Sequence, residues 1–132
     1  MTDNHIADTF AINALIAAYG DAVSRRDAAA WGATWGEDAR WVLMGHEVKG
    51  RAGIVGLWQG AMAQFDAVSF IASPGPITLA GDRATARTQT HEVLRTTEGT
   101  IRRVAGIYED EFVRTAEGWR FAARDFSVLI EH

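Results

Sequence analysis

The spacing of apolar residues changes along this 132-residue chain, and that change constrains the fold more than any other feature. In the first half, apolar residues recur every three or four positions, which is the period of an amphipathic helix. From Val68 onward they alternate with polar residues between short turn signals, as in β-strands. Helices followed by strands predict an α+β domain in which three N-terminal helices pack on one face of the sheet.

The first two helices are predicted from Asp8 to the tryptophans that follow it. The first helix spans about Asp8–Arg25 and has Tyr19 near the middle of its buried face. The side-chain oxygen of Asp27 can cap a second helix, which carries Trp31 and Trp35 one turn apart.

A short strand and a third helix complete the first half. The apolar run Trp41–Met44 has the length of a strand. The third helix is the most regular in its spacing, with apolar residues at Ile54, Leu57, Trp58, Ala61, Met62 and Phe65.

Four turn signals divide the second half into about four strands joined by tight turns. These signals are Pro74-Gly75-Pro76, Ala80-Gly81-Asp82, Thr97-Glu98-Gly99 and Ala116-Glu117-Gly118. Short connections place neighbouring strands antiparallel, so the sheet is predicted to be mainly antiparallel.

Length and composition are those of one globular domain spanning residues 1–132. The net charge of -4 gives no basic surface, so we expect no nucleic-acid partner. The absence of cysteine excludes disulfides and thiolate metal sites, and it is compatible with a cytoplasmic protein. No long apolar run follows the first residues, so neither a secretory signal nor a membrane-spanning segment is predicted.

Alternation places Glu92 on the inner face of a strand over residues 82–96. The other residues of that face are small or uncharged, namely Ala84, Ala86, Thr88, Thr90 and Leu94, whereas His91 lies on the outer face. A carboxylate in a low-dielectric site needs a partner or a raised pKa. Glu92 is therefore a candidate acid/base, with a strand-end ion pair as the alternative reading.

In the last strand, Arg124 and Asp125 are adjacent, so alternation sends only one of them into the interior. Periodicity leaves both choices open. We favour Arg124, whose guanidinium could hold an anionic ligand group or Glu92, while a structural salt bridge is equally compatible with the pattern.

Metal and cofactor chemistry has little support. The cluster Glu109-Asp110-Glu111 reads as a solvated strand end, and the four histidines are far apart in the sequence without HxH or HExxH spacing. No Gly-rich phosphate loop or GxSxG elbow occurs. We expect no metal and no cofactor.

Two stretches carry a family resemblance: YGDAVSRRDAAAWGATWGEDARW, residues 19–41, and GIYEDEFVRTAEGWRFAARDF, residues 106–126. They resemble the SnoaL-like branch of the nuclear transport factor 2-like superfamily, which includes scytalone dehydratase, ketosteroid isomerase and hexachlorocyclohexane dehydrochlorinase. The resemblance implies a cone, in which a strongly curved sheet wraps around the long helix. It also implies that the mouth of the cone binds a hydrophobic small molecule.

The resemblance also compares individual residues. Tyr19 matches the tyrosine that binds the oxyanion in ketosteroid isomerase, but Leu43 falls near the position of that enzyme's base. The Asp–His pair of the dehydratase and dehydrochlorinase is replaced by Ser24 and, approximately, Phe70. Arg124 matches an arginine that lines the dehydrochlorinase pocket, and Asp125 resembles a late-strand aspartate used by SnoaL.

Two functions follow from these residues. The first is a cofactor-independent lyase or isomerase that moves a proton on an aromatic, polyketide, terpenoid or steroid-like compound, with Glu92 or Asp125 as acid/base and Tyr19 or Arg124 stabilising negative charge. The second is a non-catalytic module for hydrophobic-ligand binding or oligomerisation. In either case we expect the pocket to be lined by Ser24, Phe70, Thr88, Thr90, Tyr108 and Phe126. Apolar residues on the outer face, such as Val93, Ile101 and Ile107, predict a homodimer or homotrimer.

Overall fold

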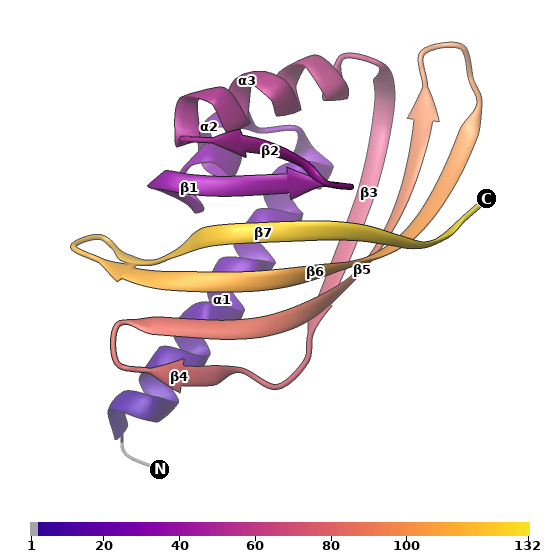
Figure 1. The fold of residues 1–132 in the computed structure, drawn as a ribbon. Helices are drawn as coiled ribbons and strands as arrows, with labels where there is room; N and C mark the ends of the chain where they lie inside the picture. Colours follow the sequence, from indigo (N-terminus) through magenta and orange to yellow (C-terminus); the bar gives the residue numbers. More distant parts are fainter. Residues whose placement is uncertain (1–2) are drawn as a thin grey trace.

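The computed structural model describes residues 3–132. Its helices are α1 (Asp3–Arg25), α2 (Ala28–Gly32) and α3 (Arg51–Met62). Its strands are β1 (Trp35–Leu43), β2 (His46–Lys49), β3 (Phe65–Pro74), β4 (Thr78–Ala80), β5 (Arg83–Thr96), β6 (Ile101–Thr115) and β7 (Gly118–Glu131). Figure 1 shows this order from the N-terminus to the C-terminus.

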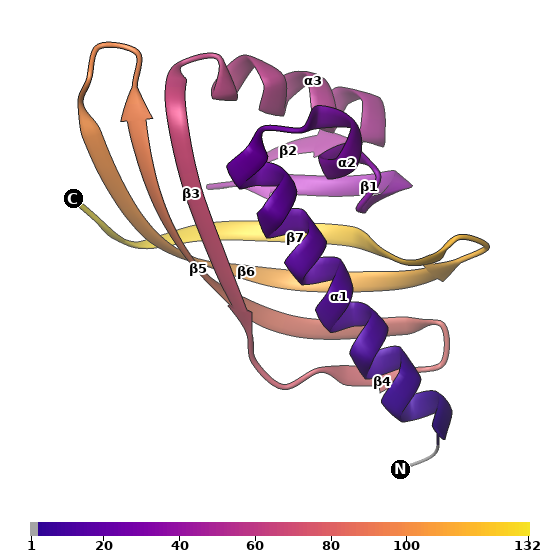
Figure 2. The same cartoon turned by 180° about the vertical axis from the view of Figure 1, so that it is seen from behind.

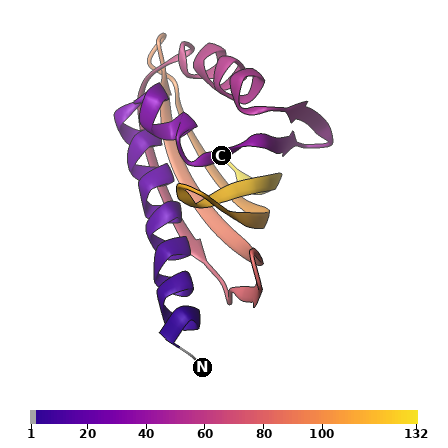
Figure 3. The same ribbon diagram turned by 90° about the vertical axis from the view of Figure 1, so that its left-hand side faces the viewer.

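The strands form one mixed, mainly antiparallel sheet in the order β2-β1-β7-β6-β5-β3, with β4 paired to β5. β1 and β7 are parallel, and the other pairs are antiparallel. Figures 2 and 3 show α1 running along one face of the sheet. The predicted α+β class is therefore confirmed, whereas the strong curvature of a cone stays a prediction.

Helix α1 begins at Asp3, five residues before the predicted start, and ends at Arg25 as expected. Its buried residues recur at helical spacing and form the core against the sheet: Ile12, Leu15, Ile16, Tyr19, Ala22 and Val23.

One helix bears on the expectation that no membrane-spanning segment occurs, which stays a prediction. The helix over Asn4–Arg25 is long and apolar enough to span a bilayer by length and composition. This is weak support for a membrane helix, because a core helix of a soluble protein meets the same criteria.

The second helix is shorter than predicted. Asp27 does cap it, accepting a hydrogen bond from the amide of Ala30 at 3.0 Å, but the helix ends at Gly32. Trp35 instead begins β1, so its expected place on the helix is wrong. The spacing could not reveal this, because Trp31 and Trp35 both pack inward with ring centroids 5.6 Å apart, as two residues on one face of a helix would also do.

The third helix matches its prediction except at two residues. Ile54 and Trp58 are buried, but Leu57 is 40% exposed and Phe65 belongs to β3. Trp58 stacks on Trp31 with ring centroids 4.4 Å apart and an interplanar angle of 13°. This stack joins α3 to α2 above the sheet.

A β-bulge changes which face of β7 is buried. Phe112 of β6 pairs with Phe121, whereas Glu111 pairs with Ala123, so the register shifts by one residue between these pairs. As a result Phe121 and Arg124 are both buried although their separation is odd. Simple alternation along β7 would send these two side chains to opposite faces, but it does not include a bulge.

Candidate active site

A small cavity lies between α1, α3 and the inner face of the sheet. Its volume is about 100 Å³, and its walls are aromatic or aliphatic apart from one carboxylate. The lining residues are Tyr19, Val23, Trp41, Leu43, Trp58, Ala61, Met62, Phe70, Glu92, Tyr108 and Phe126. Such an apolar recess with a few convergent polar groups is typical of a small-molecule site.

Glu92 projects from β5 toward this cavity, as alternation predicted, and His91 is exposed. Burial raises the pKa of Glu92 to about 7, and the positive charge of Arg102 opposes that rise. Within the described residues, no side chain hydrogen-bonds to Glu92 or forms an ion pair with it. The carboxyl group can therefore change protonation near neutral pH while facing an apolar ligand.

Three aromatic side chains place polar hydrogen-bonding groups beside the cavity. The indole Nε1–H of Trp41 donates a hydrogen bond to the hydroxyl oxygen of Tyr108 at 3.0 Å. The hydroxyl oxygens of Tyr19 and Tyr108 lie 3.5 Å apart. Burial raises the pKa of both tyrosines, so both stay protonated and can donate at neutral pH.

Arg124 is fully buried and forms an ion pair with Asp110 of β6 rather than with Glu92. Its Nε and Nη2 donate to the two Asp110 oxygens at 2.6 and 3.0 Å. The hydroxyl of Thr88 adds a hydrogen bond to Asp110 at 2.6 Å. Burial acts to lower the pKa of the guanidinium, but the Asp110 carboxylate outweighs it and the pKa lies above its ordinary value.

The reading of Glu109-Asp110-Glu111 as a solvated strand end is therefore wrong at its central residue. Asp110 is only 2% exposed, whereas Glu109 and Glu111 are exposed on the opposite face. The strand runs from Ile101 to Thr115, which places this triplet inside the sheet rather than at its end.

The Arg124 guanidinium lies behind the tyrosine rings and does not line the cavity. Its central carbon is 3.8 Å from the ring centroid of Tyr108 and 4.5 Å from that of Tyr19. The ring of Phe121 covers it at 4.2 Å. Arg124 can therefore influence a ligand only through these rings.

Ser24 and Phe70, which the resemblance placed together, do touch in the structure. The Ser24 hydroxyl accepts a hydrogen bond from the Phe70 amide at 3.0 Å and lies 3.4 Å from the Phe70 carbonyl oxygen, to which it donates. Phe70 lines the cavity, whereas Ser24 is exposed and does not. In this chain the pair joins α1 to β3 through the backbone.

Replacing Ser24 by alanine is expected to have a modest effect. The change removes the hydroxyl that accepts from the Phe70 amide at 3.0 Å and donates over a longer 3.4 Å to the Phe70 carbonyl, and at this exposed position we expect a cost on the order of one hydrogen bond, about 0.5–1.5 kcal/mol. Urea unfolding should show a loss in that range, and ligand affinity should change by no more than the same amount. A complete loss of ligand binding with an intact fold would show that Ser24 acts directly on the ligand.

The remaining predicted pocket residues divide into two groups. Tyr108 and Phe126 line the cavity, with ring centroids 4.9 Å apart. Thr88 and Thr90 are fully buried beneath it and do not line it. Thr88 binds Asp110, and the Thr90 hydroxyl has no hydrogen-bond partner among the described residues.

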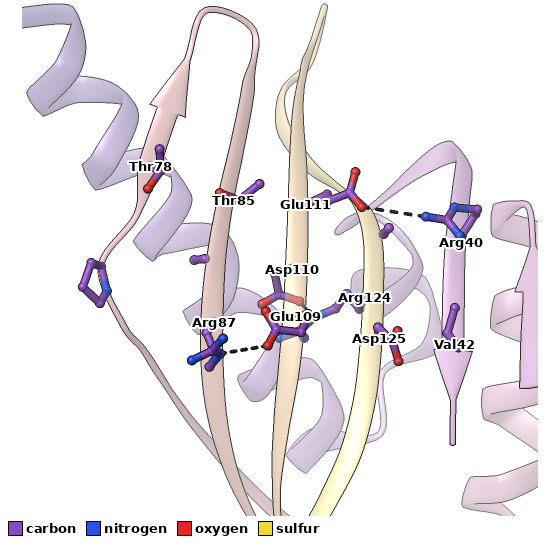
Figure 4. Close-up of a pocket in the computed structure, with 13 residues that line it drawn as sticks. Arg40, Val42, Thr78, Thr85, Arg87, Glu109, Asp110, Glu111, Arg124 and Asp125 are labelled. Carbon is purple, nitrogen blue, oxygen red and sulfur yellow. Dashed lines mark hydrogen bonds and ion pairs between the residues drawn. The ribbon is translucent and has the colours of Figure 1, made fainter. Parts of the chain in front are cut away.

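Asp125 faces away from this cavity, into a wider groove on the outer face of the sheet (Figure 4). The groove has a volume of about 480 Å³, and its charged side chains other than the buried Asp110 and Arg124 are exposed, several of them paired with one another. Arg87, for example, binds Glu109 at 2.8 Å and Arg40 lies 3.7 Å from Glu111. We place the candidate site in the smaller cavity, because the Glu92 carboxyl group there has no ion-pair partner among the described residues, whereas the buried Asp110 carboxylate of the groove is paired with Arg124.

Two residues of the site were not identified from the sequence. Asp110 alternates in step with Tyr108 and Phe112, so strand alternation places all three on the inner face; this alternation was the available signal for its burial. Trp41 was assigned only to a strand, and nothing in its local pattern indicates a hydrogen bond to Tyr108. Over residues 3–132, no group of three or more His, Asp or Glu side chains could hold a metal ion.

Comparisons with known proteins agree with this architecture. No curated protein matched the chain. A candidate scytalone dehydratase from Novosphingobium aromaticivorans DSM 12444 superposes with a TM-score of 0.91 and 21% identity, over 100% of this chain and 91% of that one. A type 2 hexachlorocyclohexane dehydrochlorinase, LinA, superposes with a TM-score of 0.89 and 17% identity, over 97% of this chain and 89% of that one.

A third structure has higher sequence identity. It is a candidate aromatic ring hydroxylase from Novosphingobium aromaticivorans, with a TM-score of 0.88 and 28% identity, covering 95% of this chain and 91% of that one. The sequence profile of the SnoaL-like domain matches residues 4–125. The chain therefore belongs to the SnoaL-like domain family, within the nuclear transport factor 2-like superfamily.

Proposed function

We propose that this protein is a cofactor-independent lyase or isomerase that transfers a proton on a small hydrophobic compound. The observation that carries the proposal is Glu92: a carboxyl group with no ion-pair partner among the described residues, whose pKa is raised to about 7 at the wall of an apolar cavity. A general acid or base is most effective when its pKa lies near the working pH. The relatives named as a dehydratase and a dehydrochlorinase carry out reactions of the lyase class.

The cavity indicates the kind of substrate. Its volume of about 100 Å³ is smaller than the roughly 150 Å³ of an engineered cavity that holds benzene, so a compound of at most one ring is favoured over a steroid or polyketide. No cationic side chain lines it, so negative charge on a bound compound can be stabilised there only by hydrogen-bond donors. The hydroxyl of Tyr19 can stabilise negative charge that develops on a substrate oxygen.

The proposal is tested by proton exchange in deuterated water. Single-ring ketones and substituted phenols are incubated with the protein, and NMR follows loss of the exchangeable C–H signals, together with any elimination product. Exchange or elimination above the rate without protein supports the proposal. Compounds that bind, as shown by calorimetry, but never exchange would instead support a ligand-binding protein.

The alternative, a non-catalytic hydrophobic-ligand-binding module, is favoured by a different observation. The positions that the resemblance assigns to the family's Asp–His pair hold Ser24 and Phe70, and the Ser24 hydroxyl is engaged in hydrogen bonds with the Phe70 backbone. Among the described residues that line the cavity, Glu92 is the only one that ionises near neutral pH. A reaction that needs a separate acid and base would then require a tyrosine hydroxyl as the second group.

The outer face of the sheet supports self-association. One cross-strand row contains Ile71, His91, Ala105 and Ile130, and the two isoleucines are 68% and 69% exposed. Such a row loses its contact with water when a second copy covers it.

We therefore expect a homodimer or homotrimer, measured by light scattering coupled to size-exclusion chromatography. Ile130→Asp should shift the protein toward the monomer, because it places a charge in the interface. Phe10→Asp is the matched control, since Phe10 is 76% exposed on α1, away from this row. A monomeric parent protein would contradict the expectation.

A further inference from the structure

We propose that Trp41 and Arg124 are positioning residues that make the Tyr108 hydroxyl a donor to a negatively charged oxygen. The favoured ligand is a compound whose ring oxygen is an anion, such as a phenolate, or becomes one, such as an enolate. The inference rests on the same cavity as the proposed function, but not on proton transfer by Glu92.

Trp41 fixes the direction of the Tyr108 hydrogen. An indole N–H can only donate, so its 3.0 Å contact requires the Tyr108 oxygen to accept. The single hydrogen of Tyr108 is then free to be donated elsewhere. The Tyr19 oxygen, at 3.5 Å, is a weak competitor for it. A ligand oxygen in the cavity, which Tyr108 lines, is the acceptor that remains.

Arg124 holds its guanidinium, which is paired with Asp110, against the Tyr108 ring without entering the cavity. Its central carbon lies 3.8 Å from the Tyr108 ring centroid, and the whole residue is 0% exposed. Among the residues that the structure describes, its Nη1 has no hydrogen-bond partner, although Nε and Nη2 are bound to Asp110. A cation–π contact of this kind opposes motion of the Tyr108 ring and so keeps its hydroxyl in place at the cavity wall.

The polarity of the cavity explains why this arrangement matters. Its walls contain no lysine or arginine, so the binding of an oxyanion depends on hydroxyl donors alone. Donors in a water-excluded site bind a charged acceptor more strongly than a neutral one. The preference for the anion over a neutral compound of the same shape is therefore the measurable consequence.

The test uses 4-nitrophenol and 4-nitroanisole, its methyl ether, which cannot ionise. Binding is measured in a Glu92→Gln protein, so that neither turnover nor the Glu92 charge contributes. The absorbance of nitrophenolate shows directly which form is bound. We expect the anion to bind at least about tenfold more tightly than the ether, the ratio expected for a charge-assisted hydrogen bond.

Two variants in this background test the positioning residues. Trp41→Phe removes the indole donor, and we expect the anion-to-ether ratio to fall by about tenfold. Trp58→Phe is the matched control, because it enlarges the same cavity without touching the Tyr108 hydrogen bond, and the ratio should be retained. The double variant Arg124→Met with Asp110→Leu removes both buried charges together, and it should also lower the anion-to-ether ratio.

The outcomes separate positioning from packing. A purely structural role would weaken both probes equally and leave the ratio unchanged. A parent protein that prefers neither probe, or binds neither, overturns the inference, as does a ratio unaffected by Trp41→Phe. None of these results depends on Glu92 catalysis, so the proposed proton transfer can fail while this inference stands, and the reverse also holds.

Discussion

Replacing Asp110 by alanine is expected to lower the free energy of unfolding by about 3–5 kcal/mol. Asp110 binds the Arg124 guanidinium through both oxygens, and neither side chain is exposed to water. Removing the carboxylate leaves a positive charge in the core without its partner, and Thr88 loses a hydrogen bond of 2.6 Å. Urea unfolding followed by circular dichroism measures the change.

Two control variants distinguish the effect of losing the ion pair from the effect of losing side-chain volume. Asp125→Ala removes a neighbouring carboxylate that is exposed, and we expect a change within about 0.5 kcal/mol. The double change Arg124→Met with Asp110→Leu removes both charges while filling the space, so it should be much less destabilising than Asp110→Ala alone. A loss below about 1 kcal/mol for Asp110→Ala would show that Arg124 gains another partner or reaches water.

Replacing Glu92 by glutamine is expected to abolish turnover of any substrate found by the exchange experiment. The amide keeps the shape of the side chain but cannot accept or release a proton near neutral pH. Because burial raises the pKa of Glu92 to about 7, the wild-type rate should depend on pH in that region. If Glu92 acts as the base, the rate rises through about pH 7 and reaches a plateau above it; if it acts as the acid, the rate falls there.

Asp125→Asn provides the matched control for this prediction. Asp125 has the same chemistry but lies on the outer face, so its amide variant should retain the full rate. If Asp125→Asn abolishes turnover while Glu92→Gln retains it, the acid/base assignment is reversed. The reaction would then belong to the outer groove.

Much of the architecture could be predicted from local pattern. The period of three to four in α1 and α3 and the alternation in β5 follow from which side chains must avoid water, and this requirement is written residue by residue in the sequence. The inward direction of Glu92 follows from the same alternation, and the structure agrees with it. The family resemblance added the expected arrangement of the helices and the sheet.

The contacts between distant residues could not be predicted in this way. Trp35 lies one helical turn from Trp31 in sequence, yet it begins a strand. Both rings enter the same core, so the burial of the two tryptophans does not distinguish a helix from a strand. The bulge in β7 depends on how that strand pairs with β6, so alternation within one strand cannot reveal it.

The sequence by itself determined the fold class and the face on which Glu92 lies, because both depend on short-range periodicity. Only the tertiary structure decided that Arg124 pairs with Asp110 and that Trp41 donates to Tyr108, across 14 and 67 residues of chain. A charged or polar side chain indicates that a partner is needed, but it does not specify which one. The partner is set by strand register and by what lies within hydrogen-bond distance after the core has packed.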